Sequence, residues 1–249
     1  MSLATRIIPT LLCRGDKLVK GKQFRGDRPI GSVIHAVRVH NMRNVDELIL
    51  LDIDATAKMR GPDLKHVRRV ADLCDMPLTV GGGVSTVDHA RQLLAAGADK
   101  VAVCSEAIGR PELIAEMADA CGSQAVVVSV DVTDDGEVRT HCGNRLAHWK
   151  LGQILTEAQV LGAGEILLQS ISRDGEMCGY DLDAIAFAWD IVSIPLVASG
   201  GCGTPRHMGQ ALRAGADAVA AGAMFQFADY TPAICAEVLA KGGRKVRQQ

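Results

Sequence analysis

Two glycine-rich segments offer backbone amides of the kind that bind phosphate groups. One is Gly81-Gly82-Gly83 and the other is Ser199-Gly200-Gly201, and each follows a short apolar run. Glycine lets the backbone approach an anion closely, and amides at a helix start favour negative charge. Either segment alone is explained by a tight turn, but the recurrence favours two phosphate sites. Each site would also use a second apolar run further along the chain, which leads into a helix start. The expected phosphate-binding residues are Gly82, Gly83, Ser105, Gly200, Gly201, Gly222 and Ala223.

Asp131 is the carboxylate best placed for acid–base chemistry. It closes the apolar run that begins at Ala125, and a carboxyl at the mouth end of a strand can exchange a proton with a bound ligand. An aspartate in this place can also simply cap the next turn. Lys20 follows the first apolar run, and we expect it to lie on a flexible loop and to meet the substrate's anionic group. Asp174 and Gly175 lie at the same rim and complete the expected substrate site.

Four charged residues stand at the opposite ends of the apolar runs. They are Arg6, Glu47, Lys100 and Glu165, two of each sign. If the runs are parallel strands of one barrel, these side chains meet at its closed end. A stabilising salt-bridge cluster and a functional ring explain the pattern equally well from residue types alone.

An internal repeat indicates which elements position these residues. Glu47-Leu-Ile-Leu-Leu reappears 118 positions later as Glu165-Ile-Leu-Leu-Gln, and Gly97-Ala-Asp99 reappears at the same offset as Gly215-Ala-Asp217. This unbroken register favours duplication over convergent patterning. Apolar runs that alternate with helical patterns predict parallel strands with crossover helices. Two four-stranded halves therefore predict an α/β fold, a (βα)8 TIM barrel with an internal half-barrel duplication.

Eight apolar runs supply the strands that such a barrel needs. We expect one domain over residues 1–249, with half-barrels of about 1–122 and 123–249. Gly97 and Gly215 should each end a helix, where a positive φ is needed. The stretch Val132–Trp149 is too long for an ordinary loop and predicts a small hairpin over the barrel mouth. The predicted strands are Ile7–Leu12, Leu48–Ile53, Leu78–Val80, Lys100–Cys104, Ala125–Asp131, Ile166–Gln169, Leu196–Ser199 and Ala218–Gly222.

Composition narrows the class of ligand. The 27 basic and 29 acidic residues nearly cancel, and no basic stripe appears, which argues against nucleic acid and anionic membrane as partners. Eight cysteines are scattered without the spacing of a zinc or redox site, so we expect no metal and no cofactor. No segment approaches a membrane span or a signal peptide, and we expect a cytoplasmic protein with reduced thiols. A small-molecule ligand follows as the default.

Short motifs spread over nearly the whole chain carry a resemblance to a known family. They are Arg6-Ile-Ile, Val19-Lys-Gly21, Asp46-Glu-Leu, Gly81-Gly-Gly83, Gly97-Ala-Asp-Lys-Val101, Gly122-Ser-Gln-Ala-Val-Val-Val128, Gly162-Ala-Gly-Glu-Ile-Leu-Leu168 and Arg173-Asp-Gly175. Together they resemble HisF, the cyclase subunit of imidazole glycerol phosphate synthase. In that family a glutaminase subunit docks at the barrel bottom, and ammonia passes a charged gate there. The gate positions match Arg6, Glu47, Lys100 and Glu165, so the resemblance implies an ammonia entrance and a heterodimer with a HisH-like glutaminase.

The family's two rim aspartates, its acid and its base, are only half matched. Asp131 matches the aspartate after strand 5, whereas Leu12 stands where the aspartate after strand 1 is expected. Leucine cannot transfer a proton, and loss of a general acid or base typically lowers a rate by about 10²–10⁴-fold. Two milder departures lie near the phosphates, Cys104 for a usual Asn and Ala223 for a usual Ser.

Leu12 and the segment Leu51-Asp-Ile-Asp-Ala-Thr56 are similar to a HisF-like branch of surface-polysaccharide, including lipopolysaccharide, pathways. That branch is associated with the conversion of an acetamido group on a nucleotide-linked sugar to an acetamidino group, beside a glutaminase and an ATP-using amidotransferase. Our first hypothesis is therefore an ammonia-using synthase subunit, of the lyase or cyclase type, that acts on such a sugar. The alternatives are the histidine-pathway cyclase itself and a non-catalytic barrel that docks the glutaminase and conducts ammonia.

Overall fold

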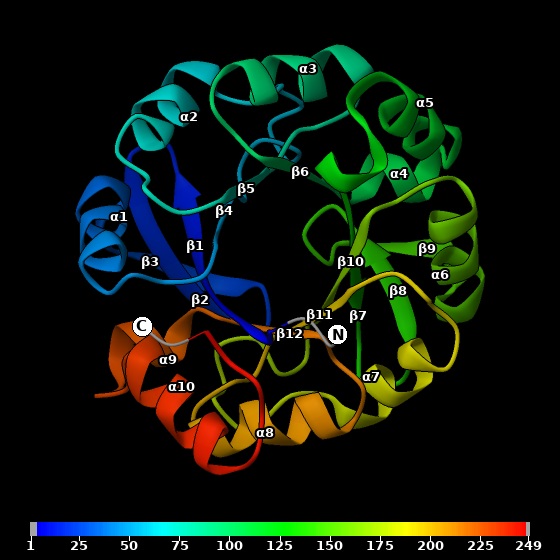
Figure 1. The fold of residues 1–249 in the computed structure, drawn as a ribbon. Coiled ribbons are helices and arrows are strands. Elements are labelled where there is room, and N and C mark those ends of the chain that lie inside the picture. The colour runs from blue at the N-terminus through cyan, green and yellow to red at the C-terminus, as the bar shows by residue number, and fades with distance from the viewer. Residues whose placement is uncertain (1–3, 248–249) are drawn as a thin grey trace.

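The computed structural model describes residues 4–247, which form a closed parallel barrel. Figure 1 looks along the barrel axis and shows the strands as an inner ring and the helices as an outer ring. The two ends of the expected domain, residues 1–3 and 248–249, lie outside the described residues. The barrel strands, in order around the ring, are β1 (Arg6–Arg14), β4 (Leu48–Asp52), β5 (Leu78–Gly81), β6 (Lys100–Val103), β7 (Val126–Val132), β10 (Glu165–Ser170), β11 (Leu196–Ser199) and β12 (Ala218–Ala221).

All eight predicted strands are confirmed, and their ends differ from the prediction by at most two residues. The ring closes because β7 pairs with β10 and β12 pairs with β1, all in parallel. These strands are buried on both faces, which is why they appear in the sequence as nearly continuous apolar runs. Every residue of β7, Val126–Val132, is buried.

The helices cover the outside of the ring, and several begin at a side-chain cap. Asp63 and Asp181, 118 positions apart, each accept a backbone N–H at 3.0 Å at the start of a helix. Such caps satisfy amides that have no partner within the helix. The helices are α1 (Val33–Met42), α2 (Leu64–Ala71), α3 (Val87–Ala95), α4 (Ser105–Gly109), α5 (Glu112–Cys121), α6 (Leu151–Val160), α7 (Leu182–Trp189), α8 (Pro205–Arg213), α9 (Ala223–Phe227) and α10 (Pro232–Lys241), with a 3-10 turn at Ser123–Ala125.

Residues related by the sequence repeat make equivalent hydrogen bonds in the two halves of the chain. Asp99 accepts the N–H of Leu78 at 2.8 Å, and Asp217 accepts the N–H of Leu196 at 2.9 Å. Gly97 and its counterpart Gly215 follow α3 and α8 with φ of 105° and 116°, as predicted. The same local chemistry therefore ties equivalent strands in both halves of the chain. The boundary between the half-barrels near residue 122 stays a prediction.

Two hairpins project from the mouth end of the barrel. The predicted hairpin in 132–149 is present as β8 (Glu137–Thr140) and β9 (Arg145–Lys150). The other, β2 (Lys17–Lys22) with β3 (Arg25–Ser32), was not predicted. The expectation that Lys20 lies on a flexible loop is therefore wrong. Lys20 lies in β2 and is buried, because this hairpin packs against the loop that follows β10.

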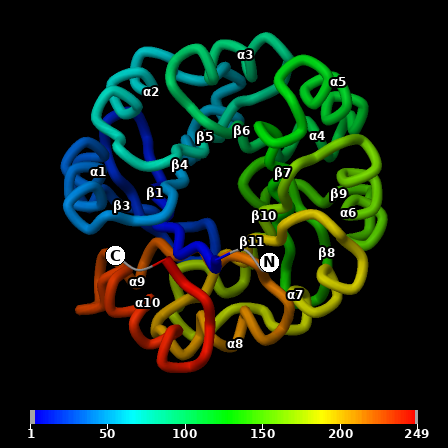
Figure 2. The backbone as a smooth tube through the Cα atoms, in the orientation of Figure 1, coloured from blue at the N-terminus to red at the C-terminus, as the bar shows by residue number. Residues whose placement is uncertain are grey.

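Strand alternation divides the barrel interior into layers. Charged side chains occupy the bottom and polar ones line the mouth, with an apolar cluster between them. The described ends of the chain lie side by side, since Thr5 pairs with Val246. Figure 2 shows the backbone passing once around the barrel, from blue through green to red. The buried residues of the apolar layer are Ile8, Ile49, Ala102, Val127, Leu167, Val197, Ala218 and Ala220.

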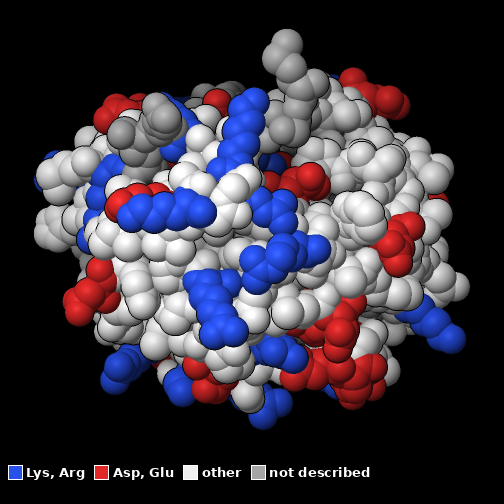
Figure 3. Space-filling model, turned by 60° about the horizontal axis from the view of Figure 1, so that its bottom comes forward, with Lys and Arg blue, Asp and Glu red and all other residues white. Residues whose placement is uncertain are grey.

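The outer surface carries both signs of charge. On the face shown in Figure 3, lysine and arginine side chains share the surface with aspartate and glutamate side chains. Within residues 4–247, no helix combines the length and the apolar character that crossing a bilayer requires.

Candidate functional site at the barrel mouth

A cavity of about 600 Å³ opens where the barrel strands end at their carboxyl termini. In this fold, catalysis gathers at that face because the loops after the strands converge there. The structure brings every sequence-predicted mouth residue to this one cavity. Its lining includes Lys20, Gly82, Gly83, Ser105, Asp131, Asp174, Gly175, Gly200, Gly201, Gly222 and Ala223.

Asp131 projects from β7 into the cavity and is buried. Burial raises the pKa of this carboxyl to about 7, with a smaller upward contribution from the charge of Asp174, while hydrogen bonds from Cys104 and Ser129 oppose the rise. A carboxyl with a pKa near neutrality is present both protonated and ionised at pH 7. It can therefore serve as a general acid or as a general base.

Lys20 and Asp174 form a buried ion pair beside Asp131. The Lys20 Nζ lies 2.9 Å from Asp174 Oδ1. The backbone N–H of Gln23 also donates to the carbonyl of Asp174, so the β2–β3 hairpin is fixed to the loop after β10. The pair brings an ammonium group into the mouth, where it can meet a ligand anion.

The two glycine-rich loops have matching geometry. Gly82 and Gly200 have φ of 114° and 90°, values that favour glycine. A Cβ on Gly83 would lie 2.4 Å from the Arg60 carbonyl oxygen, and one on Gly201 would lie 2.1 Å from a carbonyl oxygen as well. Each loop lies next to a strand that leads into a short helix, α4 or α9. The mouth thus holds two cradles of similar shape, one from each half of the chain.

An apolar wall stands where a second rim carboxylate is expected. Leu12 in β1 lies in register with Leu51 in β4, and both line the cavity. Most aspartates at the cavity are neutralised by nearby cations. The ion pairs are Asp52 with Arg60, Asp174 with Lys20, and both Asp27 and Asp54 with Arg14. Among the described residues, Asp131 is the cavity aspartate without an ion pair. It is therefore the cavity aspartate that no cation neutralises, and its carboxyl can exchange a proton with a ligand.

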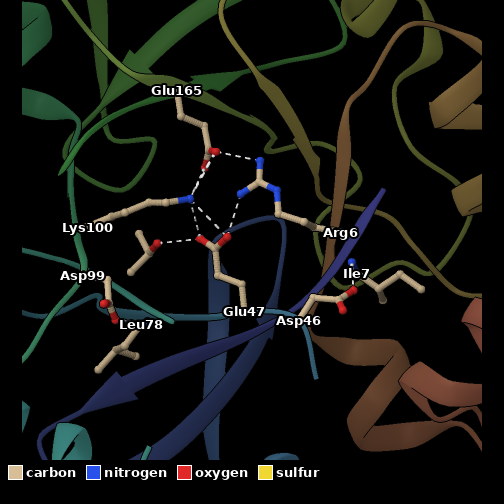
Figure 4. A network of polar contacts seen from close by, with 9 residues as sticks. Arg6, Ile7, Asp46, Glu47, Leu78, Asp99, Lys100 and Glu165 are labelled. Carbon is tan, nitrogen blue, oxygen red and sulfur yellow. Dashed lines mark hydrogen bonds and ion pairs between the residues drawn. The ribbon is translucent and has the colours of Figure 1, made fainter. Parts of the chain in front are cut away.

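The four charged residues at the bottom meet as predicted, and Figure 4 shows their heads turned toward one another. Arg6 reaches Glu47 at 2.6 Å and Glu165 at 2.7 Å, and Lys100 reaches the same glutamates at 3.0 and 3.3 Å. Burial raises the pKa of Glu47, but the charges of Lys100 and Arg6 outweigh this effect and hold its pKa below the ordinary value. Glu47 therefore stays ionised at neutral pH. The cluster of Arg6, Glu47, Lys100 and Glu165 is called here the bottom quartet.

Sequence reasoning missed two polar contacts. Thr79 donates a hydrogen bond to Glu47 at 2.8 Å, and the signal for it was a lone hydroxyl within the apolar run of β5. Cys104 approaches Asp131, with Sγ 3.6 Å from Oδ2. Strand order could have indicated this second contact, because both residues end neighbouring strands. Within residues 4–247, no cluster of three or more His, Cys, Asp and Glu residues has an arrangement that could hold a metal ion.

These features define a parallel (βα)8 barrel whose mouth contains a buried carboxyl and two glycine-rich loops of matching geometry. The family model described as histidine biosynthesis protein matches residues 6–231. A relative from Salinispora tropica is 44% identical, over 99% of this chain and 100% of its own length. Relatives from Chlorobium phaeobacteroides and Streptomyces avermitilis are each 43% identical over at least 98% of both chains. All three are described as imidazole glycerol phosphate synthase subunit HisF.

The chain therefore belongs to the HisF family of histidine biosynthesis proteins. The names of these relatives favour the histidine-pathway alternative over our first hypothesis, and no relative described here carries the name of a sugar-modifying protein.

Proposed function

We propose that this chain is the ammonia-using barrel subunit of a glutamine-dependent synthase, and that its ligand carries two phosphate groups. The observation that carries the proposal is the alignment of three layers along one axis. The bottom quartet lies below the apolar layer, and Asp131 lies above it. Burial of an ion in an apolar layer is costly, so this layer favours neutral ammonia over ammonium.

The function that the relatives favour is the cyclase step of the histidine pathway. In this proposal, a partner glutaminase of the HisH type releases ammonia at the bottom quartet. The ammonia reaches the mouth, where the two glycine-rich cradles hold the phosphates of the ribulosyl precursor and the Lys20 ammonium meets a ligand anion. Asp131 accepts and returns the protons that ring formation requires. The products are imidazole glycerol phosphate and an aminoimidazole carboxamide ribotide.

Leu12 favours a second candidate, the amidination of a nucleotide-linked sugar. Together with Leu51 it gives the mouth an apolar surface that suits the methyl group of an acetamido substituent. The diphosphate of a nucleotide sugar would then use the same cradles, and an ATP-using amidotransferase would activate the amide. Both candidates share the ammonia route and Asp131, and they differ in the ligand.

Complementation separates the two candidates. The wild-type chain is expressed in a bacterial strain that lacks its own HisF, and growth without histidine is measured with the Asp131→Asn variant as matched control. The histidine proposal expects growth from the wild type and none from the variant. Absence of growth despite wild-type levels of folded protein contradicts it.

A coupled glutaminase assay tests the sugar candidate and the conduit hypothesis. Purified barrel is mixed with a HisH-type glutaminase, and glutamine hydrolysis is measured with either the ribulosyl precursor or a nucleotide-linked acetamido sugar. Stimulation by the sugar alone supports the second candidate. A barrel that only conducts ammonia predicts that Asp131→Asn leaves product formation unchanged, whereas the proposed function expects a loss of at least about 10²-fold.

A further inference from the structure

The carboxyl of Asp131 lies close to the thiol of Cys104 at the mouth. Cys104 lies at the end of β6, directly before α4, and β6 pairs with β7. Its Sγ lies 3.6 Å from Asp131 Oδ2, within the range of a sulfur hydrogen bond. Burial, and then the neighbouring carboxyl, raise the pKa of the Cys104 thiol well above its ordinary value. The thiol therefore keeps its proton and acts as a donor.

The neighbouring strands bring no free cation to Asp131. Gln169 of β10 lies opposite it in register and is neutral. Arg139 of β8 also lies opposite, but its guanidinium is paired with Glu137 at 2.6 Å. The environment on both sides of β7 therefore does little to favour the ionised carboxyl.

The surrounding loops also do little to favour the ionised form of Asp131. Asp174 adds negative charge on one side, and its partner cation Lys20 lies 2.9 Å from it. Cys142, in the turn between β8 and β9, lines the same cavity, and burial raises the pKa of its thiol to about 11. Ser129 on β7 adds one hydroxyl. The side-chain donors to Asp131 named here are thus neutral, and one of them is a thiol, which is a weak donor.

We infer that Cys104 is a positioning residue that holds Asp131 and, by donating only weakly, leaves this one carboxyl able both to accept and to donate a proton. Strand 1 brings Leu12 to the mouth in place of an acid or base. When Asp131 serves as both base and acid, the proton that it accepts in one step is the proton that it returns in a later step. That Asp131 serves as both base and acid rests on the proposed function. The effect of Cys104 on the protonation of Asp131 does not.

The identity of residue 104 should therefore set the protonation of Asp131. An amide at this position is a stronger donor than a thiol and would favour the ionised carboxylate. Asp131 would then act mainly as a base at neutral pH. An alanine would remove the donor and favour the protonated form.

A substrate-free titration tests this inference. The full chain is labelled with ¹³C at aspartate side chains, and the Asp131 carboxyl signal is assigned by its loss in Asp131→Asn. Its pKa is then measured in the wild type, in Cys104→Asn and in Cys104→Ala. Cys235→Ala is the matched control, because Cys235 is buried on α10 and does not line the mouth cavity. Thermal unfolding of each variant verifies its fold.

The expected result is a graded series. Cys104→Asn lowers the pKa of Asp131 by about one unit, and Cys104→Ala raises it by about half a unit. Cys235→Ala leaves it unchanged. Equal Asp131 pKa values in wild type and in whichever Cys104 variant folds overturn the inference. Because the titration uses neither substrate nor glutaminase, this failure is distinguishable from a failure of the proposed function.

Discussion

Replacement of Asp131 by asparagine should stabilise the protein above neutral pH, because burial of an ionised carboxyl opposes folding. The folded pKa of Asp131 is about 7, against an ordinary value of 3.8, and burial is the main cause. Below pH 3.8 the carboxyl is protonated in both the folded and the unfolded state. Between pH 3.8 and 7 the Asp131 carboxyl ionises only in the unfolded state, so the contribution of Asp131 to folding stability falls steadily. Above pH 7 both states are ionised and the loss is complete.

The difference between the two pKa values sets the size of the effect. About three pKa units at about 1.4 kcal/mol each give a loss of about 4 kcal/mol between pH 4 and pH 8. Asparagine has nearly the same shape and does not ionise, so the variant escapes this loss. Its free energy of unfolding relative to wild type should therefore rise by about 4 kcal/mol over this range.

Urea unfolding at several pH values between 4 and 8 measures this difference. Asp16→Asn is the control, since a hydrogen bond from Arg69 holds the pKa of exposed Asp16 below its ordinary value. As pH rises, the free energy of unfolding of Asp16→Asn relative to wild type should fall, whereas that of Asp131→Asn should rise. The change for Asp16→Asn should also be the smaller of the two. A flat difference for Asp131→Asn across the range would refute the reasoning that burial controls this carboxyl.

Three further substitutions test the ion pairs and the glycine-rich loops. Lys20→Met leaves the carboxylate of Asp174 buried without its cation, and urea unfolding at pH 7 should show a loss of about 3–5 kcal/mol. Lys100→Met leaves Arg6 to neutralise both glutamates, so we expect a loss of about 1–2 kcal/mol, and glutamine-dependent turnover should fall more than ammonium-dependent turnover. Gly201→Ala places a methyl group 2.1 Å from a carbonyl oxygen at a φ of 94°. It should lower the unfolding midpoint far more than the control Gly136→Ala, which meets open space at a φ of 80°. Equal midpoints for the two alanine variants would contradict the close approach seen in the structure.

The barrel itself could be predicted from sequence because its strands are buried on both faces. The run Val126–Val130 is apolar except for Ser129, and the repeat supplies the order of the elements. The bottom quartet could also be predicted, because parallel strands bring their first residues to one end. The position of the glycine-rich loops at the mouth followed from the same rule at the other end of the barrel.

The β2–β3 hairpin could not be predicted, because tertiary contacts form it. β3 contains glycine, proline and several charged residues, which are poor strand formers. Its partner strand is held by Lys20, Lys22 and Gln23, which contact the distant loop near Asp174. Cys104 was assigned only to the phosphate region for the same reason. Its contact with Asp131 is a tertiary contact that depends on the relative orientation of the ends of β6 and β7.

An isotope competition experiment tests most directly whether ammonia crosses the barrel to Asp131. The barrel and a HisH-type glutaminase are supplied with glutamine labelled with ¹⁵N in its amide, excess unlabelled ammonium and the ribulosyl precursor or the nucleotide-linked sugar that proves active. The account predicts that the product carries ¹⁵N well above the level of the bulk ammonium pool, and that Lys100→Met reduces this excess. A wild-type product with the isotope ratio of the bulk pool would contradict the account.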